Sequence, residues 1–599
     1  MTAVLLYAGA TVRQYADLLC KNPRWLYLGK DLTQREPLSQ LLGEKNLLPL
    51  DGRLHRIAEK LRQPFLDFIA GLGRIQEDQL GWWSSTCSWK NSTASDLFLL
   101  VCYEHLANEL LSEKGDGKLI IVVEDFWLYC QLKDIYGRRE EIQFGASPRL
   151  WPICLKASLM GAAGRVVWTF RLLRSFVTQR RFWKEDARSQ QSPKLVAFYS
   201  HPQVRCLIGT DGWNDPYLVN LDRQLEEVGF SICRFSPPEI GGFEEAIAKR
   251  QHYFSPLIRF LTLRSLLRAI FAIWNPVWLP SPEICGRPIP WLLLREWWLD
   301  RWRASYLLYR VFFDCAAQFL KREAVKVVIY PYENHPWEKM LVLAARRQKV
   351  ATLGYQHGGG IARFMLPYFH GHGEAEWAPL PDVIMTSGPY SHQLLATGGT
   401  PEDRLVFGGS LRYEGLQKKY DEVSLLCPES PIRILVSLPV ETLLAEHLLL
   451  ALKRAFPDGG LADGIKFLVK AHPMCPVSVK SSQWPVSIAT DSFQDALRSC
   501  AAVVYAGTST GMEALAMGRV AIRYRSELLL NTDRGEFLTE RQVKDCGDWD
   551  VRTCVLSAVQ EMAESTDRRT VQADLVKEVF PPVDREAWIR TVQRLCRPQ

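Results

Sequence analysis

The sequence predicts an α/β protein made of two doubly wound, parallel-sheet lobes with a cleft between them, plus helical insertions rich in basic and aromatic residues. Its 599 residues are too many for one hydrophobic core, so two or more domains are expected. From residue 325 onward, short apolar runs alternate with helical patterns at the spacing typical of parallel sheets. A polar, proline-bearing stretch at residues 413–431 divides this series and is predicted to be a linker.

Three regions follow from these patterns. Residues 1–193 are predicted to form an N-terminal α/β region with a basic helical insertion, and residues 194–425 a first parallel-sheet lobe joined to it. Residues 430–599 are predicted to form the second lobe, ending in a helix. Apolar runs of strand length support the N-terminal assignments, at residues 4–7, 25–28, 119–123 and 194–200.

The composition is that of an ordinary globular protein, with 47% hydrophobic and 23% charged residues. The net charge of +7, from 73 basic and 66 acidic residues, is mild and does not indicate nucleic-acid binding. The 15 cysteines lack metal-site or disulfide spacing, which indicates reduced thiols in the cytoplasm. The apolar N-terminus lacks a basic leader and is predicted to be a strand. No uncharged apolar stretch reaches roughly 18 residues, so no spanning helix is expected.

The stretch FLVKAHPMCP, at residues 467–476, places charged side chains at the end of a predicted buried strand. In open parallel sheets, ligands bind beyond the carboxyl ends of the strands. Lys470 and His472 lie two residues apart, so both side chains leave the same face of the strand, and Pro473 ends it. This arrangement suits a phosphate or diphosphate. A surface histidine before a turn proline is the alternative.

The stretch AVVYAGTSTGMEALAMG, at residues 502–518, reads as a strand, a glycine turn and a helix. Helix N-termini attract anions, and the hydroxyls of Thr508, Ser509 and Thr510 can cap the helix or donate to phosphate. Glu513 lies one turn after Ser509, where its carboxylate can accept both hydroxyls of a ribose. An ordinary capping arrangement is the alternative. We expect this stretch and the previous one to follow adjacent strands and to form one nucleotide site.

Residues 430–525 resemble the donor lobe of a GT-B glycosyltransferase, a fold of two Rossmann-like lobes. The K-x-H-P and S/T-S/T-G-x-E-A-L pair is similar to motifs of bacterial sialyltransferases, capsule Kdo transferases and CDP-glycerol polymerases. The resemblance implies that His472, Ser509 and Thr510 bind the phosphate of a cytidine nucleotide, with Lys470 assisting. The expected donor-binding set is Lys470, His472, Pro473, Thr508, Ser509, Thr510, Gly511 and Glu513.

The stretch IYPYENHPWEKM, at residues 329–340, again follows a predicted strand. An inverting sugar transfer needs a base that removes the proton of the acceptor hydroxyl. Glu333 is the first candidate for this base, and a structural pair with an arginine is its alternative role. Glu338 is expected to stabilise its own helix N-terminus. His357 is the second candidate base, and Asp125, after another predicted strand, is the third.

The stretch GYQHGGGIARF, at residues 354–364, contains three consecutive glycines that can form a concavity rich in N–H groups. Gln356, Gly358, Gly359 and Arg363 are expected to contact the donor sugar or the acceptor, and a flexible hinge is the alternative. This stretch and PYENHPWEKML also resemble a family of bacterial surface-carbohydrate biosynthesis proteins. No His/Asp cluster with metal-ligand spacing was recognised, so no metal or other cofactor is expected.

Two basic and aromatic segments, at residues 151–193 and 250–310, suit contact with a membrane. On a helical wheel, residues 260–274 place most of their large apolar side chains on one broad face, with Arg264 and Arg268 opposite. Such a helix, together with the arginine-rich residues 165–184, could rest on an anionic membrane surface. An amphipathic helix packed on its own domain is the alternative.

These features predict an inverting, metal-independent glycosyltransferase that moves a sugar from a nucleotide-sugar donor to a surface or lipid-linked glycan. The resemblance implies a CMP-activated ulosonic or nonulosonic acid, such as Kdo or a sialic-acid-like sugar. The alternatives are a CDP-glycerol-type transferase of polyol phosphate, a UDP-sugar 2-epimerase and a non-catalytic scaffold that binds a nucleotide sugar. The predicted location is the cytoplasm, with peripheral contact at the inner face of the cytoplasmic membrane.

Overall fold

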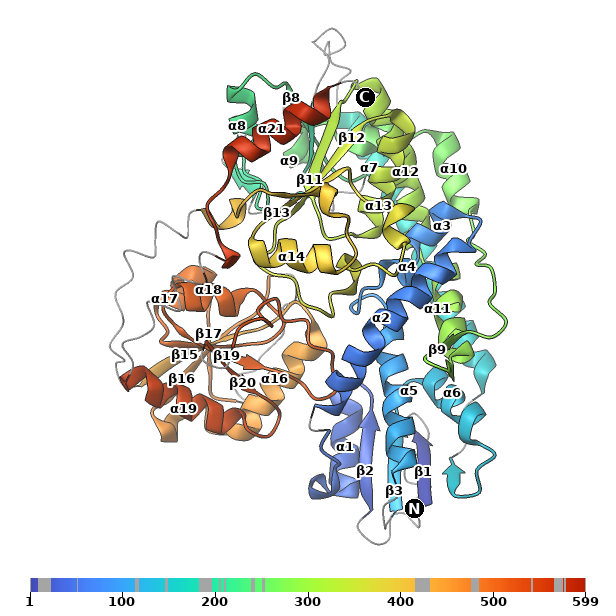
Figure 1. Cartoon of the computed structure of the whole chain (residues 1–599), viewed down its shortest axis with the longest axis vertical. Helices are drawn as coiled ribbons and strands as arrows, with labels where there is room; N and C mark the ends of the chain where they lie inside the picture. The colour runs from blue at the N-terminus through green and yellow to red at the C-terminus, as the bar shows by residue number, and fades with distance from the viewer. Residues whose placement is uncertain are drawn as a thin grey trace.

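The chain folds into three parallel sheets covered by helices, shown by the computed structural model in Figure 1. The structure describes residues 2–8, 23–50, 52–113, 118–145, 149–182, 196–203, 206–208, 212–238, 243–249, 254–414, 431–473, 475, 484–539, 542–564, 575 and 578–597. Most of the predicted linker, and the predicted boundary near residue 193, lie outside these residues.

The N-terminal sheet has the strand order β2-β3-β1-β4, with all neighbours parallel. Its central strands are buried on both faces, which is why they read as continuous apolar runs. The predicted strands at 4–7, 25–28 and 119–123 are confirmed. The elements are β1 Thr2–Tyr7, β2 Arg24–Leu28, α1 Leu32–Leu42, α2 Arg53–Arg74, α3 Gln79–Ser84, α4 Thr86–Trp89, α5 Leu97–Ser112, β3 Lys118–Val123, α6 Phe126–Tyr136 and β4 Ile142–Phe144.

The middle sheet has six parallel strands in the order β14-β13-β12-β11-β5-β8. Numbered along the chain, this is the doubly wound order 2-1-3-4-5-6, which reverses direction between β5 and β11. Its elements are β5 Val196–Tyr199, α8 Leu221–Glu227, β8 Ile232–Phe235, α12 Ser305–Arg322, β11 Val327–Pro331, α13 Pro336–Gln348, β12 Ala351–Gln356, β13 Val383–Thr386, α14 Pro389–Thr397 and β14 Leu405–Phe407.

The C-terminal sheet has the order β17-β16-β15-β18-β19-β20, again all parallel. Along the chain this is 3-2-1-4-5-6, and it reverses between β15 and β18. Its elements are β15 Ile432–Ser437, α16 Thr442–Ala455, β16 Ile465–Lys470, β17 Ser487–Ile488, α17 Phe493–Arg498, β18 Ala502–Tyr505, α18 Thr510–Ala516, β19 Val520–Tyr524, β20 Val543–Cys546 and α19 Val551–Glu564.

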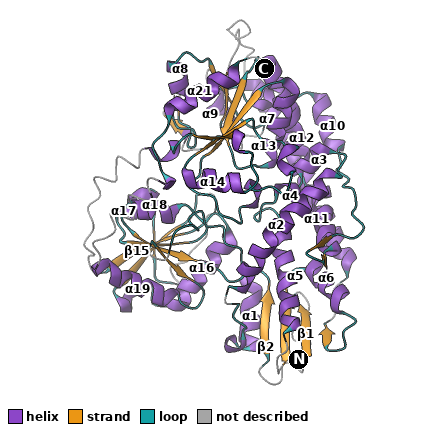
Figure 2. Ribbon diagram, in the orientation of Figure 1, coloured by secondary structure: helices purple, strands orange, loops and turns teal. Residues whose placement is uncertain are grey.

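The middle and C-terminal sheets confirm the predicted fold class, two Rossmann-like lobes of the GT-B type with helical insertions (Figure 2). The insertions contain α9 Glu244–Ala248, α10 Leu263–Phe271 and α11 Pro290–Trp302, and two short hairpins, β6 Leu207–Ile208 with β7 Gly212–Trp213 and β9 Glu283–Ile284 with β10 Arg287–Pro288. Helix α10 is shorter than the amphipathic helix predicted over residues 260–274.

One hydrophobic core joins the N-terminal sheet to the middle lobe. It contains side chains from both, including Trp25, Leu293 and Tyr330, all inaccessible to solvent. Contacts also reach the C-terminal lobe. The Tyr103 hydroxyl donates to the Leu528 carbonyl at 2.6 Å. These contacts fix the N-terminal region against both lobes.

Helix α7, Leu150–Phe182, departs from the expectation that no helix could span a membrane. By length and composition, its segment Leu150–Thr178 is long and apolar enough, with a mean hydropathy of 1.2 over a window of which none is buried. The few charged residues in this segment interrupt every uncharged apolar stretch, so none reaches the length of roughly 18 residues that the prediction required.

The C-terminal helix α21, Arg585–Cys596, packs against one face of the middle sheet. From the sequence, this helix was predicted to belong to the second lobe. Trp588 is its anchor, with 1% of its surface exposed. The indole Nε1 donates to the Gly408 carbonyl at 3.0 Å, and the ring meets Tyr355 edge to face with centroids 5.3 Å apart. The chain therefore returns to the middle lobe after completing the C-terminal sheet.

Replacing Trp588 by alanine should destabilise the middle lobe by about 3–5 kcal/mol, because it empties a buried site and removes one of the two hydrogen bonds that the Gly408 carbonyl accepts. Chemical denaturation followed by circular dichroism checks this. Arg590→Ala, on the exposed side of the same helix, is the control and should change stability by no more than about 0.5 kcal/mol. Equal midpoints for the two variants would contradict the anchoring role.

Candidate active site

Two loops lie where the two lobes reverse their strand order. Glu333 follows β11, which borders the reversal in the middle sheet, and Ser509 follows β18, which borders the reversal in the C-terminal sheet. In doubly wound sheets, the crossovers leave a crevice beyond the carboxyl ends of the strands at this point, and ligands bind there. Topology therefore selects these two loops before any side chain is considered.

Glu333 is the centre of the first loop. Its carboxylate lies 2.9 Å from His335 Nε2 and 3.5 Å from His357 Nε2, and it accepts a hydrogen bond of 3.2 Å from Arg534 of the C-terminal lobe. Glu338 holds the loop in place, because its carboxylate accepts hydrogen bonds from the backbone N–H groups of Glu333 and Asn334. Glu338 thus stabilises the start of α13, as its position predicted.

The charges around Glu333 decide which group can act as a base. Burial opposes ionisation, but hydrogen bonds from His335 and His357 outweigh it and hold the pKa of Glu333 well below its usual value. Glu333 is therefore ionised and a weak base. Burial lowers the pKa of His357, against the opposing effect of Glu333. Its Nδ1 is buried and has no hydrogen-bond partner among the described residues. The neutral imidazole is the better base of the two.

The glycine run beside His357 is crowded by another part of the chain. A Cβ atom on Gly358 would lie 2.1 Å from the guanidinium of Arg534, and one on Gly359 would lie 2.7 Å from the Phe580 ring. Arg534 also donates to the Gly360 carbonyl at 3.3 Å. The glycines thus admit residues of the C-terminal half close to this loop, and the predicted contact with a ligand stays a prediction.

Gln356 and Arg363 were also predicted to contact the sugar or the acceptor, and they lie in different surroundings. The Gln356 amide is fully buried; it donates to the Gly358 carbonyl at 2.6 Å and accepts from the Ser387 hydroxyl at 2.8 Å, so it braces the loop. Arg363 lines a separate cavity of about 530 Å³ between α2 and the ends of β19 and β20. There its backbone N–H donates to Glu536 at 2.7 Å.

The second loop lies at the start of α18. Ser509 is the N-cap residue, and its hydroxyl donates to Glu513 at 3.1 Å. The Thr508 hydroxyl accepts the backbone N–H of Thr510 at 3.0 Å. Burial raises the pKa of the Glu513 carboxyl, which favours its protonated form. Gly511 is required by packing, because a Cβ there would lie 2.0 Å from the Tyr505 ring.

Arg412 and Tyr413 lie between the two loops. The Tyr413 hydroxyl is 3.5 Å from both Ser509 Oγ and Glu513 Oε1. Arg412 lies over the Tyr413 ring, 5.3 Å from its centroid. Tyr413 contributes most to the raised pKa of Arg412, and Glu513 and Glu333, from opposite lobes, add to it. We call the set Glu333, His335, His357, Arg412, Tyr413, Ser509, Glu513 and Arg534 the interlobe centre.

The K-x-H-P segment lies further along the same edge. Lys470 and Tyr505 both pair with Ser437 of β15, so β16 and β18 end at the same level on either side of it. The expectation that these strands are adjacent is therefore wrong, because β15 separates their ends by about 10 Å. Lys470 donates to the Asp491 carbonyl, His472 forms a bridge with Cys475, and Pro473 is exposed in the turn between them.

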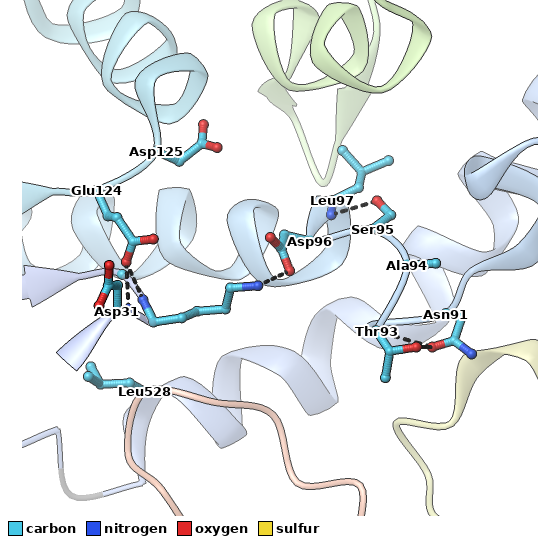
Figure 3. A network of polar contacts seen from close by, with 12 residues as sticks. Asp31, Asn91, Thr93, Ala94, Ser95, Asp96, Leu97, Glu124, Asp125 and Leu528 are labelled. Carbon is cyan, nitrogen blue, oxygen red and sulfur yellow. Dashed lines mark hydrogen bonds and ion pairs between the residues drawn. The ribbon is translucent and has the colours of Figure 1, made fainter. Parts of the chain in front are cut away.

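Asp125, the third candidate base, belongs to a structural network in the N-terminal sheet (Figure 3). Its carboxylate caps α6 by accepting the N–H groups of Trp127 and Leu128, and it pairs with Arg295 at 3.0 Å. The neighbouring Glu124 accepts three hydrogen bonds on one oxygen, from the Tyr27 hydroxyl and from the backbone N–H groups of residues 30 and 31. These carboxylates brace their own domain.

Arg534, His335, Arg412 and Tyr413 were not predicted from the sequence. Arg534 lies in a loop without a recognisable motif, and only its position after β19 could have suggested it. His335 carries a weak signal, since it belongs to one of three His-Pro pairs and lies two residues from Glu333. Arg412 and Tyr413 lie where the sequence reads as the start of the linker.

The sequence contains one Asp-x-Asp stretch, at residues 548–550, a pattern that binds a metal ion in metal-dependent sugar transferases. Its first carboxylate accepts from the Tyr524 hydroxyl and lies 3.7 Å from Arg35, and the second accepts the Gly547 N–H at 2.6 Å. Asp548 is thus engaged by residues of β19 and α1, and Asp550 by its own loop. Among the residues the structure describes, no three His, Cys, Asp or Glu side chains lie together in a group that could hold a metal ion.

No protein-family model and no curated protein matches the sequence. Among solved structures, the UDP-GlcNAc 2-epimerase from Neisseria meningitidis bound to UDP-GlcNAc is 11% identical, with a TM-score of 0.37 over 67% of this chain and 97% of that chain. MurG from Acinetobacter baumannii is 14% identical, with a TM-score of 0.37 over 67% and 100%. A putative UDP-N-acetylglucosamine 2-epimerase from Listeria monocytogenes is 10% identical, with a TM-score of 0.40 over 67% and 95%. The fold assignment rests on the strand order of the two sheets.

Proposed function

We propose that this chain is an inverting glycosyltransferase whose donor is a CMP-activated ulosonic or nonulosonic acid and whose acceptor is a surface or lipid-linked glycan. The transfer is proposed to need no metal ion and to take place in the cytoplasm. The observation that carries the proposal is the interlobe centre. There, Arg534 of the C-terminal lobe bonds to Glu333 in the first loop, and Tyr413 lies against Ser509 and Glu513 in the second.

The chemistry divides between the two lobes. The loop at Ser509 presents hydroxyl groups and the start of a helix, which suit the phosphate of a nucleotide. The buried Glu513 carboxyl beside it suits the hydroxyls of a ribose. Arg412 and Arg534 supply positive charge where a departing phosphate develops negative charge, which is the role that a metal ion has in other transferases.

The base is proposed to be His357. Its Nε2–H faces Glu333, so Nδ1 carries the free electron pair. In the transfer, the acceptor hydroxyl oxygen attacks the anomeric carbon, its proton passes to Nδ1, and CMP leaves with the electrons of the broken C–O bond. Glu333 orients the ring and stabilises the imidazolium that forms. Glu333, the first candidate for the base, thus becomes a positioning residue.

CMP should bind more tightly than CDP, UDP, UMP or GDP. At a hundred times its Kd, a nucleotide stabilises the fold by about 2.7 kcal/mol, which thermal unfolding of the full chain detects. Ser509→Ala should weaken CMP binding about tenfold through the lost hydroxyl, and Ser499→Ala, on the exposed surface of the same lobe, should not. A preference for CDP would favour the polyol-phosphate transferase, and one for UDP would favour the 2-epimerase. If no nucleotide raises the temperature of thermal unfolding, the proposed nucleotide site is refuted.

Glu333→Gln should reduce turnover by about 10²–10⁴-fold and weaken CMP binding far less, because the amide no longer aligns and charges the imidazoles while the loop at Ser509 keeps its groups. Release of CMP from a panel of CMP-linked acidic sugars, with glycan acceptors, measures turnover. Glu402→Gln, an exposed carboxylate of the same lobe, is the control. Unchanged turnover in Glu333→Gln removes this residue from the mechanism. If the wild type binds CMP tightly but shows no turnover, the result favours a non-catalytic scaffold that binds a nucleotide sugar.

Turnover should fall on the acid side of a pH profile, with an inflection below pH 6.5. The base must be neutral to accept a proton, and burial lowers the pKa of His357, so its protonated, inactive form accumulates only below the usual histidine range. His357→Asn should lower turnover and remove this inflection. An inflection above pH 6.5, or one that persists in His357→Asn, would contradict the assignment of the base.

A further inference from the structure

Helix α7 is packed on one face only. The Trp298 indole donates to the Cys154 carbonyl at 3.2 Å, and a Cβ on Gly161 would lie 2.6 Å from Trp302. Arg165 donates to the Ile270 and Ala272 carbonyls at the end of α10, and Leu172 is buried. These contacts extend over residues 154–172, about 27 Å of the helix. A helix held along this length by its own protein lies on the surface of that protein and does not cross a bilayer.

The opposite face of α7 is apolar and exposed. Six of its exposed large side chains recur at intervals of four or seven residues and therefore form one stripe along the helix, and the exposed Met160 and Val167 widen this apolar face. We call this the outward stripe: Trp151, Leu155, Leu159, Val166, Phe170 and Val177. A surface helix of a soluble protein normally shows the reverse pattern, with apolar residues inward and polar residues outward. An exposed apolar patch of this extent marks an interaction site.

Helix α10 adds a second, shorter apolar face. Leu263, Leu267 and Phe271 are four residues apart and exposed, whereas Leu266 and Ala269 are buried. The two hydrogen bonds from Arg165 join the middle of α7 to the end of α10. The apolar side of α10 is thus shared between the protein core and the solvent.

The charge of these helices selects the partner. Residues 150–182 contain one lysine and five arginines and no acidic residue, and α10 contains two arginines and no acidic residue. Arg171 and Arg174 are exposed next to Phe170. Apolar side chains flanked by arginines complement a bilayer with anionic headgroups. A second copy of this chain would bring the same positive charges face to face.

We propose that α7, together with α10, lies in the plane of an anionic membrane. The outward stripe inserts at the boundary between headgroups and acyl chains, and the flanking arginines meet the phosphates. This inference concerns where the protein resides, so it stands or falls separately from the proposed sugar transfer.

Flotation of the full chain with vesicles tests the proposal. The wild type should float with vesicles of equal parts phosphatidylglycerol and phosphatidylcholine, and much less with phosphatidylcholine alone. Leu159→Glu should lower the partition coefficient at least about tenfold, because it places a charge in the inserted stripe. Leu461→Glu is the matched control, since Leu159 and Leu461 are both 61% exposed and Leu461 lies in the C-terminal lobe.

Four results would overturn the proposal. They are no flotation of the wild type, equal flotation with both kinds of vesicle, equal behaviour of Leu159→Glu and Leu461→Glu, and retention of the wild type in the membrane after alkaline carbonate. Light scattering without lipid provides a further check. A wild-type dimer that Leu159→Glu dissociates would assign the outward stripe to a second copy of the chain and refute the membrane assignment.

Discussion

The ion pair between Arg534 and Glu333 is the constraint on which the arrangement of the two lobes depends. It joins a loop of the C-terminal sheet to a loop of the middle sheet, beside the reversal of strand order in the middle sheet. Gly358 leaves space for the guanidinium, and Gly360 leaves space for the backbone of Arg534. Glu333 in turn holds two imidazoles. Both charges are partly shielded from solvent, so the loss of one partner weakens the hold on the others.

The strand ends could be predicted from the sequence because the signals are local. Apolar runs of four to six residues mark β11, β12, β16 and β18, and the polar residues after them mark the edge where ligands bind. Strand order is not local. Nothing within residues 465–510 shows that β15, from earlier in the chain, separates β16 from β18. For this reason the Lys470–His472 loop and the Ser509 loop were expected to be closer than they are.

Side-chain roles were predictable only where a short motif carries them. The Glu338 cap and the Ser509–Glu513 pair arise from spacing within one helix turn. Arg534 reaches Glu333 across 201 residues of sequence, and no local pattern encodes such a contact. Helix α7 shows a third limit: an apolar stripe has the same period whether it faces a core or the solvent. Only the packing of its other face against Trp298 and Trp302 identifies which side is free.

The return of α21 to the middle sheet sets the order in which the protein can be made. Trp588 and Val592 complete a core whose strands leave the ribosome long before them. While α21 is still being translated, the nascent chain can assemble the C-terminal sheet but must leave part of one face of the middle sheet uncovered. Such exposed apolar surface is what chaperones bind. A message that ends prematurely would thus yield a polypeptide with one finished lobe and one that is unable to close.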